Sequence, residues 1–178
     1  MCIRDRPLVI ISAAGNPEEL EFWGDLTAKI QAAFPLVTVR CLAHQQPKNC
    51  PEECWVQHWP GMMVLQQANV IVGGGGYNTI FEAVALGTPL ISIPHGRRYD
   101  DQKQRSIRWS YPVSNADEAI ATLSVLLQTQ QREQTRQKYI NGADSAIPLI
   151  EAAQRKQQGG RSTLYSDQRL MDEPTTDG

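Results

Sequence analysis

Short apolar runs alternate with longer amphipathic stretches along the first 130 residues of the chain. Residues 8–11 and 69–72 are rich in β-branched residues, and such runs are typical of strands buried on both faces of a parallel sheet. Residues 36–42 predict a third strand. An apolar stripe with helical spacing precedes that strand at Leu20, Trp23, Leu26, Ile30 and Phe34. The pattern predicts an α/β fold with a Rossmann-like parallel sheet flanked by helices.

Further helices are expected around and after the second buried run. Residues 62–68 predict a short helix, and another helix is expected to open at Asn78 or Thr79. Residues 116–127 and 132–153 predict two closing helices. Together these elements predict alternating strands and helices of one α/β unit.

We expect one domain over residues 7–154. Residues 1–6 resemble no element that would precede the first strand, and they are interpreted as a truncation or a sequence junction. Residues 155–178 are rich in Gln, Gly, Ser, Asp and Thr and contain few apolar residues, so we expect a disordered tail.

Length and charge exclude some classes of protein. The 178 residues suffice for a core of ordinary size. A net charge of −2 argues against a general nucleic-acid surface. No apolar run reaches the roughly 20 residues that a membrane-spanning helix needs. Because the sequence shows no signal peptide, we expect a cytoplasmic location.

Four consecutive glycines, residues 73–76, follow the second buried run. Glycine lets the chain turn where a Cβ would clash and leaves backbone N–H groups accessible. A helix that opens directly afterwards adds unpaired N–H groups and the positive end of its dipole, which together attract phosphate. The sequence therefore predicts an anion site that needs no metal.

The residues after these glycines resemble a known family. Residues 75–94, GGYNTIFEAVALGTPLISIP, are followed by Asp100-Asp101-Gln102. This order resembles the C-terminal, donor-binding half of GT-B glycosyltransferases, and specifically the family 28 C-terminal type that includes the lipid II-forming UDP-GlcNAc transferases. The similarity extends over residues 7–153 and is densest in this central block.

The resemblance implies a role for particular residues. It implies that the donor's diphosphate binds at Gly75, Gly76, Tyr77, Asn78 and Thr79, with the first glycine turn, Gly15 and Asn16, as further candidates. It implies that Glu82 accepts hydrogen bonds from the ribose hydroxyls, a task suited to a carboxylate with two acceptor oxygens. It implies that Asp101 and Gln102 hold the donor sugar.

A purely structural role remains open for each of these residues. Asn78 and Thr79 are also suitable N-caps, and Glu82 is also suitable as a solvated helix residue. Asp100 or Asp101 would equally cap a following helix. Gly15 and Asn16 fit a plain turn in which Pro17 starts the helix.

Aromatic and histidine residues near the glycine turn also have two readings. The resemblance places the uracil base near residues 56–58, where Trp55 and Trp59 offer rings for stacking, although we expect at least one of them to lie in the core. His95 lies where it could contact a phosphate, and an exposed loop position is the alternative.

The chain departs from the family pattern after Gln102. Relatives commonly continue with two residues and then Asn-Ala, whereas this chain has Lys103 to Ser106. Relatives also tend to insert a longer segment with a further strand, whereas this chain reaches residues 109–112 directly. This departure puts the sugar-side pocket in doubt but leaves the phosphate end unaffected.

The resemblance implies the donor-binding half of an inverting, metal-independent glycosyltransferase. It implies a UDP-sugar as donor substrate, without a separate cofactor, and transfer of a hexosyl group, specifically N-acetylglucosaminyl. The acceptor would be held by an N-terminal domain or partner subunit, and membrane contact would arise only through that partner or a lipid-linked acceptor. No residue of this chain is assigned as the catalytic base.

Other functions remain as alternatives. A sugar-nucleotide epimerase of GT-B-like fold and a non-catalytic nucleotide-binding module both fit the glycine turn. A dinucleotide-dependent oxidoreductase fits less well, because the Gly-x-Gly-x-x-Gly spacing fails after Gly76. Zinc-binding residue types occur at Cys41, His44, Cys50, Cys54 and His58, but their spacing matches no familiar zinc framework. A Cys50–Cys54 disulfide is a further alternative.

Overall fold

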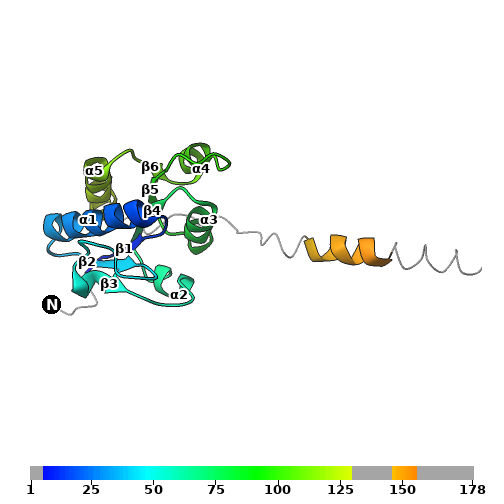
Figure 1. Cartoon of the computed structure of the whole chain (residues 1–178), viewed down its shortest axis with the longest axis horizontal. Coiled ribbons are helices and arrows are strands. Elements are labelled where there is room, and N and C mark those ends of the chain that lie inside the picture. The colour runs from blue at the N-terminus through cyan, green and yellow to red at the C-terminus, as the bar shows by residue number, and fades with distance from the viewer. Residues whose placement is uncertain (1–5, 130–145, 156–178) are drawn as a thin grey trace, which may run out of the picture. The chain divides into compact units, whose positions relative to one another are not determined.

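Six parallel strands form one sheet in a computed structural model that describes residues 6–129 and 146–155 (Figure 1). The strands are β1 (Leu8–Ser12), β2 (Thr38–Leu42), β3 (Trp55–Val56), β4 (Val70–Gly74), β5 (Leu90–Ile93) and β6 (Tyr111–Pro112). Their order is β3-β2-β1-β4-β5-β6, and every neighbouring pair is parallel. This is the strand order of a Rossmann fold, which confirms the predicted fold class.

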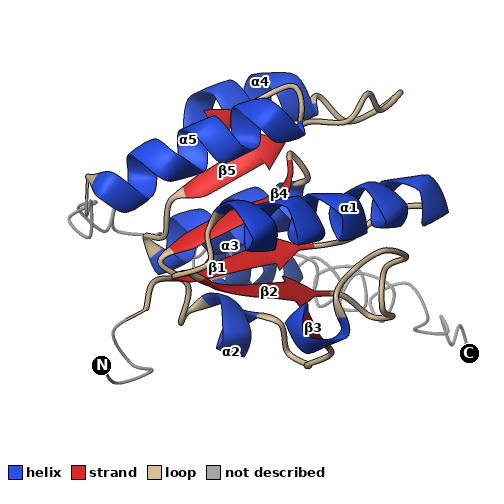
Figure 2. Cartoon of the chain, turned by 90° about the vertical axis from the view of Figure 1, so that its left-hand side faces the viewer, coloured by secondary structure: helices blue, strands red, loops and turns tan. Residues whose placement is uncertain are grey.

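Helices cover both faces of this sheet (Figure 2). They are α1 (Pro17–Ala33), α2 (Met62–Leu65), α3 (Tyr77–Leu86), α4 (Gln102–Trp109) and α5 (Ala116–Gln128), with a 3-10 turn at Glu52–Cys54. One core joins α1 and α5 to the sheet and includes Trp23 and Leu123, and the other joins α2 and α3 to its opposite face and includes Leu65 and Ile80.

The central strands explain why both faces need helices. Val9 and Ile11 of β1 belong to one core, whereas Ile10 between them belongs to the other, and all three are fully buried. Successive side chains of a strand point to opposite faces, so an uninterrupted apolar run buries both. The apolar runs in the sequence therefore predicted the buried strands correctly.

The structure differs from the predicted elements around the site. The helix α3 begins at Tyr77, with Gly76 as its N-cap, and not at Asn78 or Thr79. Its C-terminal end has Gly87 in the left-handed conformation at φ 63°, the usual way for a helix to stop. The strands β3, β5 and β6 were not predicted, and β3 and β6 have only two residues each, too few to carry a periodicity.

The C-terminal part of the chain is described only over residues 146–155, which are helical. The rest of the closing helix predicted over residues 132–153, the tail predicted from residue 155, and the junction predicted for residues 1–6 lie largely outside the described residues. Within the described ranges, no helix is long and apolar enough to cross a membrane.

Candidate functional site

The carboxyl ends of β1 and β4 lie side by side at the centre of the sheet, where Ser12 pairs with Gly73. The chain leaves β1 for one half of the sheet and returns through β4 to the other half. Ligands of open α/β sheets bind in the crevice at this topological switch point. The loops after β1, β4 and β5 are therefore the candidate components of one site.

The turn between β4 and α3 presents backbone donors that the helix does not use. The N-cap is Gly76, which has no side chain to accept from the first turn, and the first helical bond runs from the Ile80 N–H to the Gly76 carbonyl, at 3.1 Å. The N–H groups of Tyr77, Asn78 and Thr79 therefore have no acceptor within the helix. The helix dipole adds partial positive charge at the same place.

This geometry changes the interpretation of Asn78 and Thr79. Both residues lie inside the first helical turn, so neither is the N-cap that the alternative reading proposed. The Asn78 side chain is exposed, and the Thr79 side chain is half-buried beside Gly73. The predicted contacts of Gly75, Gly76, Tyr77, Asn78 and Thr79 with a diphosphate remain a prediction.

The glycines of the turn have unequal surroundings. A Cβ on Gly73 would lie 2.9 Å from Cγ2 of Thr79, and a Cβ on Gly75 would lie 2.6 Å from Oγ of Ser106. A Cβ on Gly76 would meet no atom within 4 Å. Gly73 and Gly75 are thus required by protein packing, whereas Gly76 borders open space at the start of α3.

The turn between β1 and α1 is built differently, because an internal carboxylate occupies its donors. Asn16 caps α1 and forms a capping box with Glu19: the Glu19 N–H donates to Asn16 Oδ1, and the Asn16 N–H donates to Glu19 Oε2, both at 2.9 Å. Gly15 has a φ of 130°, and its hydrogen faces the Glu19 carboxylate. Pro17 starts the helix. The structure thus gives Gly15 and Asn16 the plain-turn role, and their predicted contact with a diphosphate stays a prediction.

Glu19 also links this turn to the loop after β5. The side chain of Glu19 is 10% exposed, and its two carboxylate oxygens accept from Nη2 of Arg97 at 2.5 and 2.7 Å. Burial alone would raise the pKa of Glu19, but the hydrogen bonds from Arg97 and the Asn16 N–H lower it below its usual value. Glu19 therefore stays ionised at neutral pH and holds Arg97 beside the switch point.

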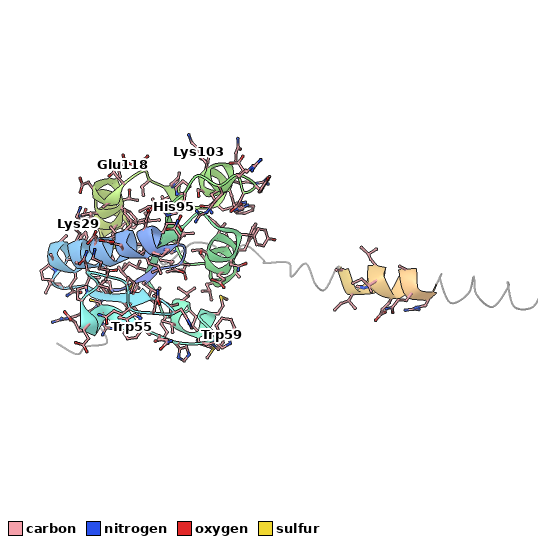
Figure 3. All side chains as sticks on the ribbon, in the orientation of Figure 1. Lys29, Trp55, Trp59, His95, Lys103 and Glu118 are labelled. Carbon is pink, nitrogen blue, oxygen red and sulfur yellow. The ribbon has the colours of Figure 1, made fainter. Side chains whose placement is uncertain are left out.

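His95 lies next to this ion pair, by the start of α1 (Figure 3). Its Nδ1 is 3.8 Å from Oε1 of Glu19, and its ring packs edge-on against Trp23 at a centroid distance of 5.8 Å. Its Nε2 is buried and has no hydrogen-bond partner among the described residues. His95 is therefore packed against α1 and is not the exposed loop histidine of the alternative reading.

Glu82, the predicted ribose ligand, lies in α3 and is half-buried. Its carboxylate has no hydrogen-bond or ion-pair partner among the described residues, and burial raises its pKa above the usual value. A half-buried carboxylate without a partner is costly for the protein alone, and such groups are enriched at functional sites. This environment disfavours the reading of Glu82 as a solvated helix residue.

Asp101 and Gln102, the predicted sugar ligands, both have structural contacts. Asp101 caps α4 by accepting from the Gln104 N–H at 3.1 Å, as the capping alternative expected. Gln102 is 8% exposed: its Oε1 accepts from the His95 N–H at 3.0 Å, and its Nε2 donates to Oδ2 of Asp100 at 3.1 Å. Residues 95–103 line a hollow of about 390 Å³. The role of both residues in sugar binding remains a prediction.

Two arginines near the site were missed by sequence reasoning. Arg97 contacts Glu19, and Arg105 contacts the glycine turn through Gly75. Both contacts join loops or helices that are far apart in the sequence, and no motif in the sequence marks either arginine. The only signal in the sequence is the cluster of basic residues that follows His95.

The tryptophans and cysteines near β3 are mostly structural. Trp55 packs against the core and donates from Nε1 to the Ala43 carbonyl at 3.3 Å, as expected for at least one tryptophan, whereas Trp59 is 91% exposed. The predicted base position at residues 56–58 remains a prediction.

Cys41, Cys50 and Cys54 are buried as free thiols, so the Cys50–Cys54 disulfide is not formed. Burial raises the pKa of Cys41 to about 12, which keeps its thiol protonated and unreactive at neutral pH. No cluster of three potential metal ligands occurs within the described ranges.

Comparison with protein families supports the interpretation of the central block. Residues 62–106 match the model of the glycosyltransferase family 28 C-terminal domain. The match covers α2, β4, α3, β5 and the first part of α4, which together carry the glycine turn, Glu82 and Gln102. No curated protein matches the chain.

Solved glycosyltransferase structures share the fold at low sequence identity. The spinosyn forosaminyltransferase SpnP is 16% identical with a TM-score of 0.60, over 83% of this chain and 44% of that protein. VinC in complex with dTDP is 18% identical with a TM-score of 0.54, over 85% and 42%. The spinosyn rhamnosyltransferase SpnG with thymidine diphosphate is 16% identical with a TM-score of 0.55, over 69% and 37%.

These structures establish the architecture of the described domain. The six-stranded parallel sheet with flanking helices matches the Rossmann-like fold of GT-B glycosyltransferases. The chain spans less than half the length of each of these proteins.

Proposed function

We propose that this chain is the donor-binding half of a glycosyltransferase that uses a nucleoside diphosphate sugar. The observation that carries the proposal is the start of α3: an uncapped helix N-terminus behind open Gly76, at the switch point of the sheet, inside the stretch that matches the family model. Three N–H groups without an acceptor in the helix, together with the helix dipole, suit a diphosphate, which carries its charge on several oxygen acceptors.

The donor is proposed to be a UDP-sugar. Glu82 lies in the helix that starts at the anion site, and its two oxygens, which have no partner among the described residues, suit the 2′ and 3′ hydroxyls of a ribose. Two of the similar structures were solved with thymidine diphosphate, which supports a nucleoside diphosphate as the ligand class. A ribonucleotide offers Glu82 two hydroxyls and a deoxyribonucleotide only one, so Glu82 favours the former.

The proposed reaction is inverting transfer of a hexosyl group, specifically N-acetylglucosaminyl, to an acceptor hydroxyl. The hydroxyl attacks the anomeric carbon, the bond to the diphosphate breaks, and the negative charge of the leaving group grows on the phosphate oxygens. Donors fixed at the start of α3 stabilise that charge more in the transition state than in the ground state, without a metal ion. The catalytic base and the acceptor surface belong to a second domain or subunit.

The substitution Gly76→Ala tests the anion site. Because Gly76 has φ −64° and ψ 156° and open space around it, alanine fits the protein without strain. The new methyl group would occupy the space proposed for the diphosphate. We expect an unchanged melting temperature and at least a tenfold weaker affinity for UDP by calorimetry, with the same affinity in the presence and absence of EDTA.

Each result of this experiment is informative. Tight UDP binding by the Gly76→Ala protein would show that the diphosphate does not lie at this turn. Loss of wild-type UDP binding on addition of EDTA would refute the metal-free mechanism. The effect of Gly76→Ala on UDP binding would still test whether the diphosphate lies at this turn.

A further inference from the structure

Arg105 in α4 is hydrogen-bonded to the glycine turn. Its Nη1 donates to the Gly75 carbonyl at 2.9 Å, and its Nη2 pairs with Oδ1 of Asp100 at 2.5 Å. Its guanidinium carbon lies 5.6 Å from the centre of the Tyr77 ring. The side chain is only 20% exposed. Three contacts, with a backbone carbonyl, a carboxylate and an aromatic ring, therefore hold this guanidinium group beside the turn.

The contact with the Gly75 carbonyl has a consequence for the next N–H group. The peptide bond between Gly75 and Gly76 is planar and trans, so its carbonyl and its N–H point in opposite directions. Since Arg105 holds the carbonyl toward α4, the N–H of Gly76 points away from α4. The space proposed for the diphosphate is the open side of Gly76, where a Cβ would meet no atom within 4 Å apart from those of Gly76 and its chain neighbours.

Packing of α4 against Gly75 holds the turn at this distance. A Cβ on Gly75 would lie 2.6 Å from Oγ of Ser106 and 3.0 Å from Cβ of Gln102. A side chain at this position would collide with α4, so glycine permits the close approach at which Arg105 reaches the Gly75 carbonyl.

We propose that Arg105 is a positioning residue that orients the Gly75–Gly76 peptide so that the Gly76 N–H donates to the donor's diphosphate. The inference rests on the proposed function. Arg105 does not touch the ligand; Asp100 and Tyr77 keep the guanidinium group in place, and the guanidinium group keeps the peptide in place. The turn is therefore oriented before the ligand arrives, and binding need not cost the reorientation of a flexible glycine segment.

The substitution Arg105→Gln tests the inference in the full-length chain. We expect affinity for UDP to fall about tenfold by calorimetry, the loss of one oriented donor to a charged acceptor. Binding of uridine, which has no phosphate, should change less than twofold. In NMR spectra, UDP should shift the Gly76 amide signal strongly in the wild-type protein and weakly in the variant.

The matched control is Arg108→Gln, which removes the same charge from an exposed position of the same helix. It should leave UDP affinity within twofold of the wild type. A similar loss in both variants would show a general effect of charge and overturn the positioning role. Equal losses for UDP and uridine in Arg105→Gln would show that Arg105 only supports the fold, and unchanged UDP binding would also overturn the inference.

A second variant separates positioning from direct contact with phosphate. Asp100→Asn keeps the arginine and removes the negative charge that anchors it. If Arg105 acts by positioning, UDP binding should weaken severalfold; if Arg105 binds the phosphate itself, releasing it from Asp100 should strengthen UDP binding and overturn the inference. Failure of the wild-type chain to bind UDP would sink the proposed function together with the inference, whereas wild-type binding that Arg105→Gln leaves intact would sink the inference alone.

Discussion

Replacement of Glu82 gives the most direct test of how the nucleotide is recognised. The carboxylate is half-buried and unpartnered among the described residues, so both oxygens are available to the two hydroxyls of a ribose. The loss of a hydrogen bond to a charged group costs about 1.5–3 kcal/mol, which corresponds to roughly 10- to 150-fold in affinity. We therefore expect Glu82→Ala to weaken UDP binding by a factor within that range.

The assay compares three nucleotides that differ only in their hydroxyls. Calorimetry with UDP, 2′-deoxy-UDP and 2′,3′-dideoxy-UDP should give a large, an intermediate and a negligible effect of Glu82→Ala. The matched control is Glu21→Ala, a partly exposed glutamate of α1 that pairs with Lys48, and it should leave all three affinities unchanged. Equal losses for UDP and the dideoxy nucleotide would make Glu82 a structural residue.

Removal of the Glu82 charge should also increase the stability of the ligand-free protein. Burial raises the pKa of Glu82 in the folded protein, so the native state binds the proton more tightly than the unfolded state. The carboxyl group thus favours folding at low pH, and this advantage is lost as the pH rises through the folded-state pKa. Glu82→Gln should make the ligand-free protein more stable than the wild type to urea at pH 7 and equally stable below about pH 4. Lower stability of the variant at pH 7 would refute the argument.

Three further predictions concern the loops around the site. Gly15→Ala should destabilise the protein by about 1–3 kcal/mol in urea unfolding, because the residue has φ 130° and its Cβ would collide with Glu19; a cost below 0.5 kcal/mol would contradict the strain argument. Glu19→Gln should cost about 1–3 kcal/mol at pH 7; because the folded-state pKa of Glu19 is lowered, the difference should shrink as the pH falls through that value, and a constant difference down to pH 3 would argue against the ion pair with Arg97. Gln102→Ala should cost about 1–3 kcal/mol by leaving the His95 N–H without its acceptor, and with a reconstituted acceptor domain it should weaken use of the UDP-sugar more than binding of UDP, as measured by initial rates and calorimetry; an equal effect on both would remove the sugar assignment.

The sheet could be predicted from the sequence because its central strands carry an unambiguous pattern. Val9, Ile10 and Ile11 are all fully buried, and a continuous β-branched run has few stable alternatives to a strand covered on both faces. The helix α4 lacks such a signal, since Gln102–Trp109 is mostly polar. It is held by the Asp101 cap and by the buried side chains of Gln102 and Ser106, which pack against the glycine turn.

The side-chain contacts of the site could not be predicted, because they join distant segments. Glu19 and Arg97 are 78 residues apart, and Arg105 and Gly75 are 30 residues apart. A charged residue in a loop has no periodicity that would reveal its partner. The family resemblance located the glycine turn and Glu82, but it contained no information on Arg97 or Arg105, whose surroundings follow from the packing of loops at the sheet edge.

The two glycine turns show why local sequence alone could not decide which one binds an anion. Both follow a buried central strand, and in both an asparagine stands at or near the start of a helix. At α1, Glu19 stands three residues after Asn16 and closes a capping box, so a carboxylate of the protein already satisfies the helix start. At α3, the residue three positions after the N-cap Gly76 is Thr79, and no side chain caps the helix. An external diphosphate that displaced Glu19 would also have to break its pairing with Arg97, whereas at α3 it would only replace water. The competition between an internal and an external anion therefore favours α3 as the diphosphate site and leaves α1 as the support that holds Arg97 in place.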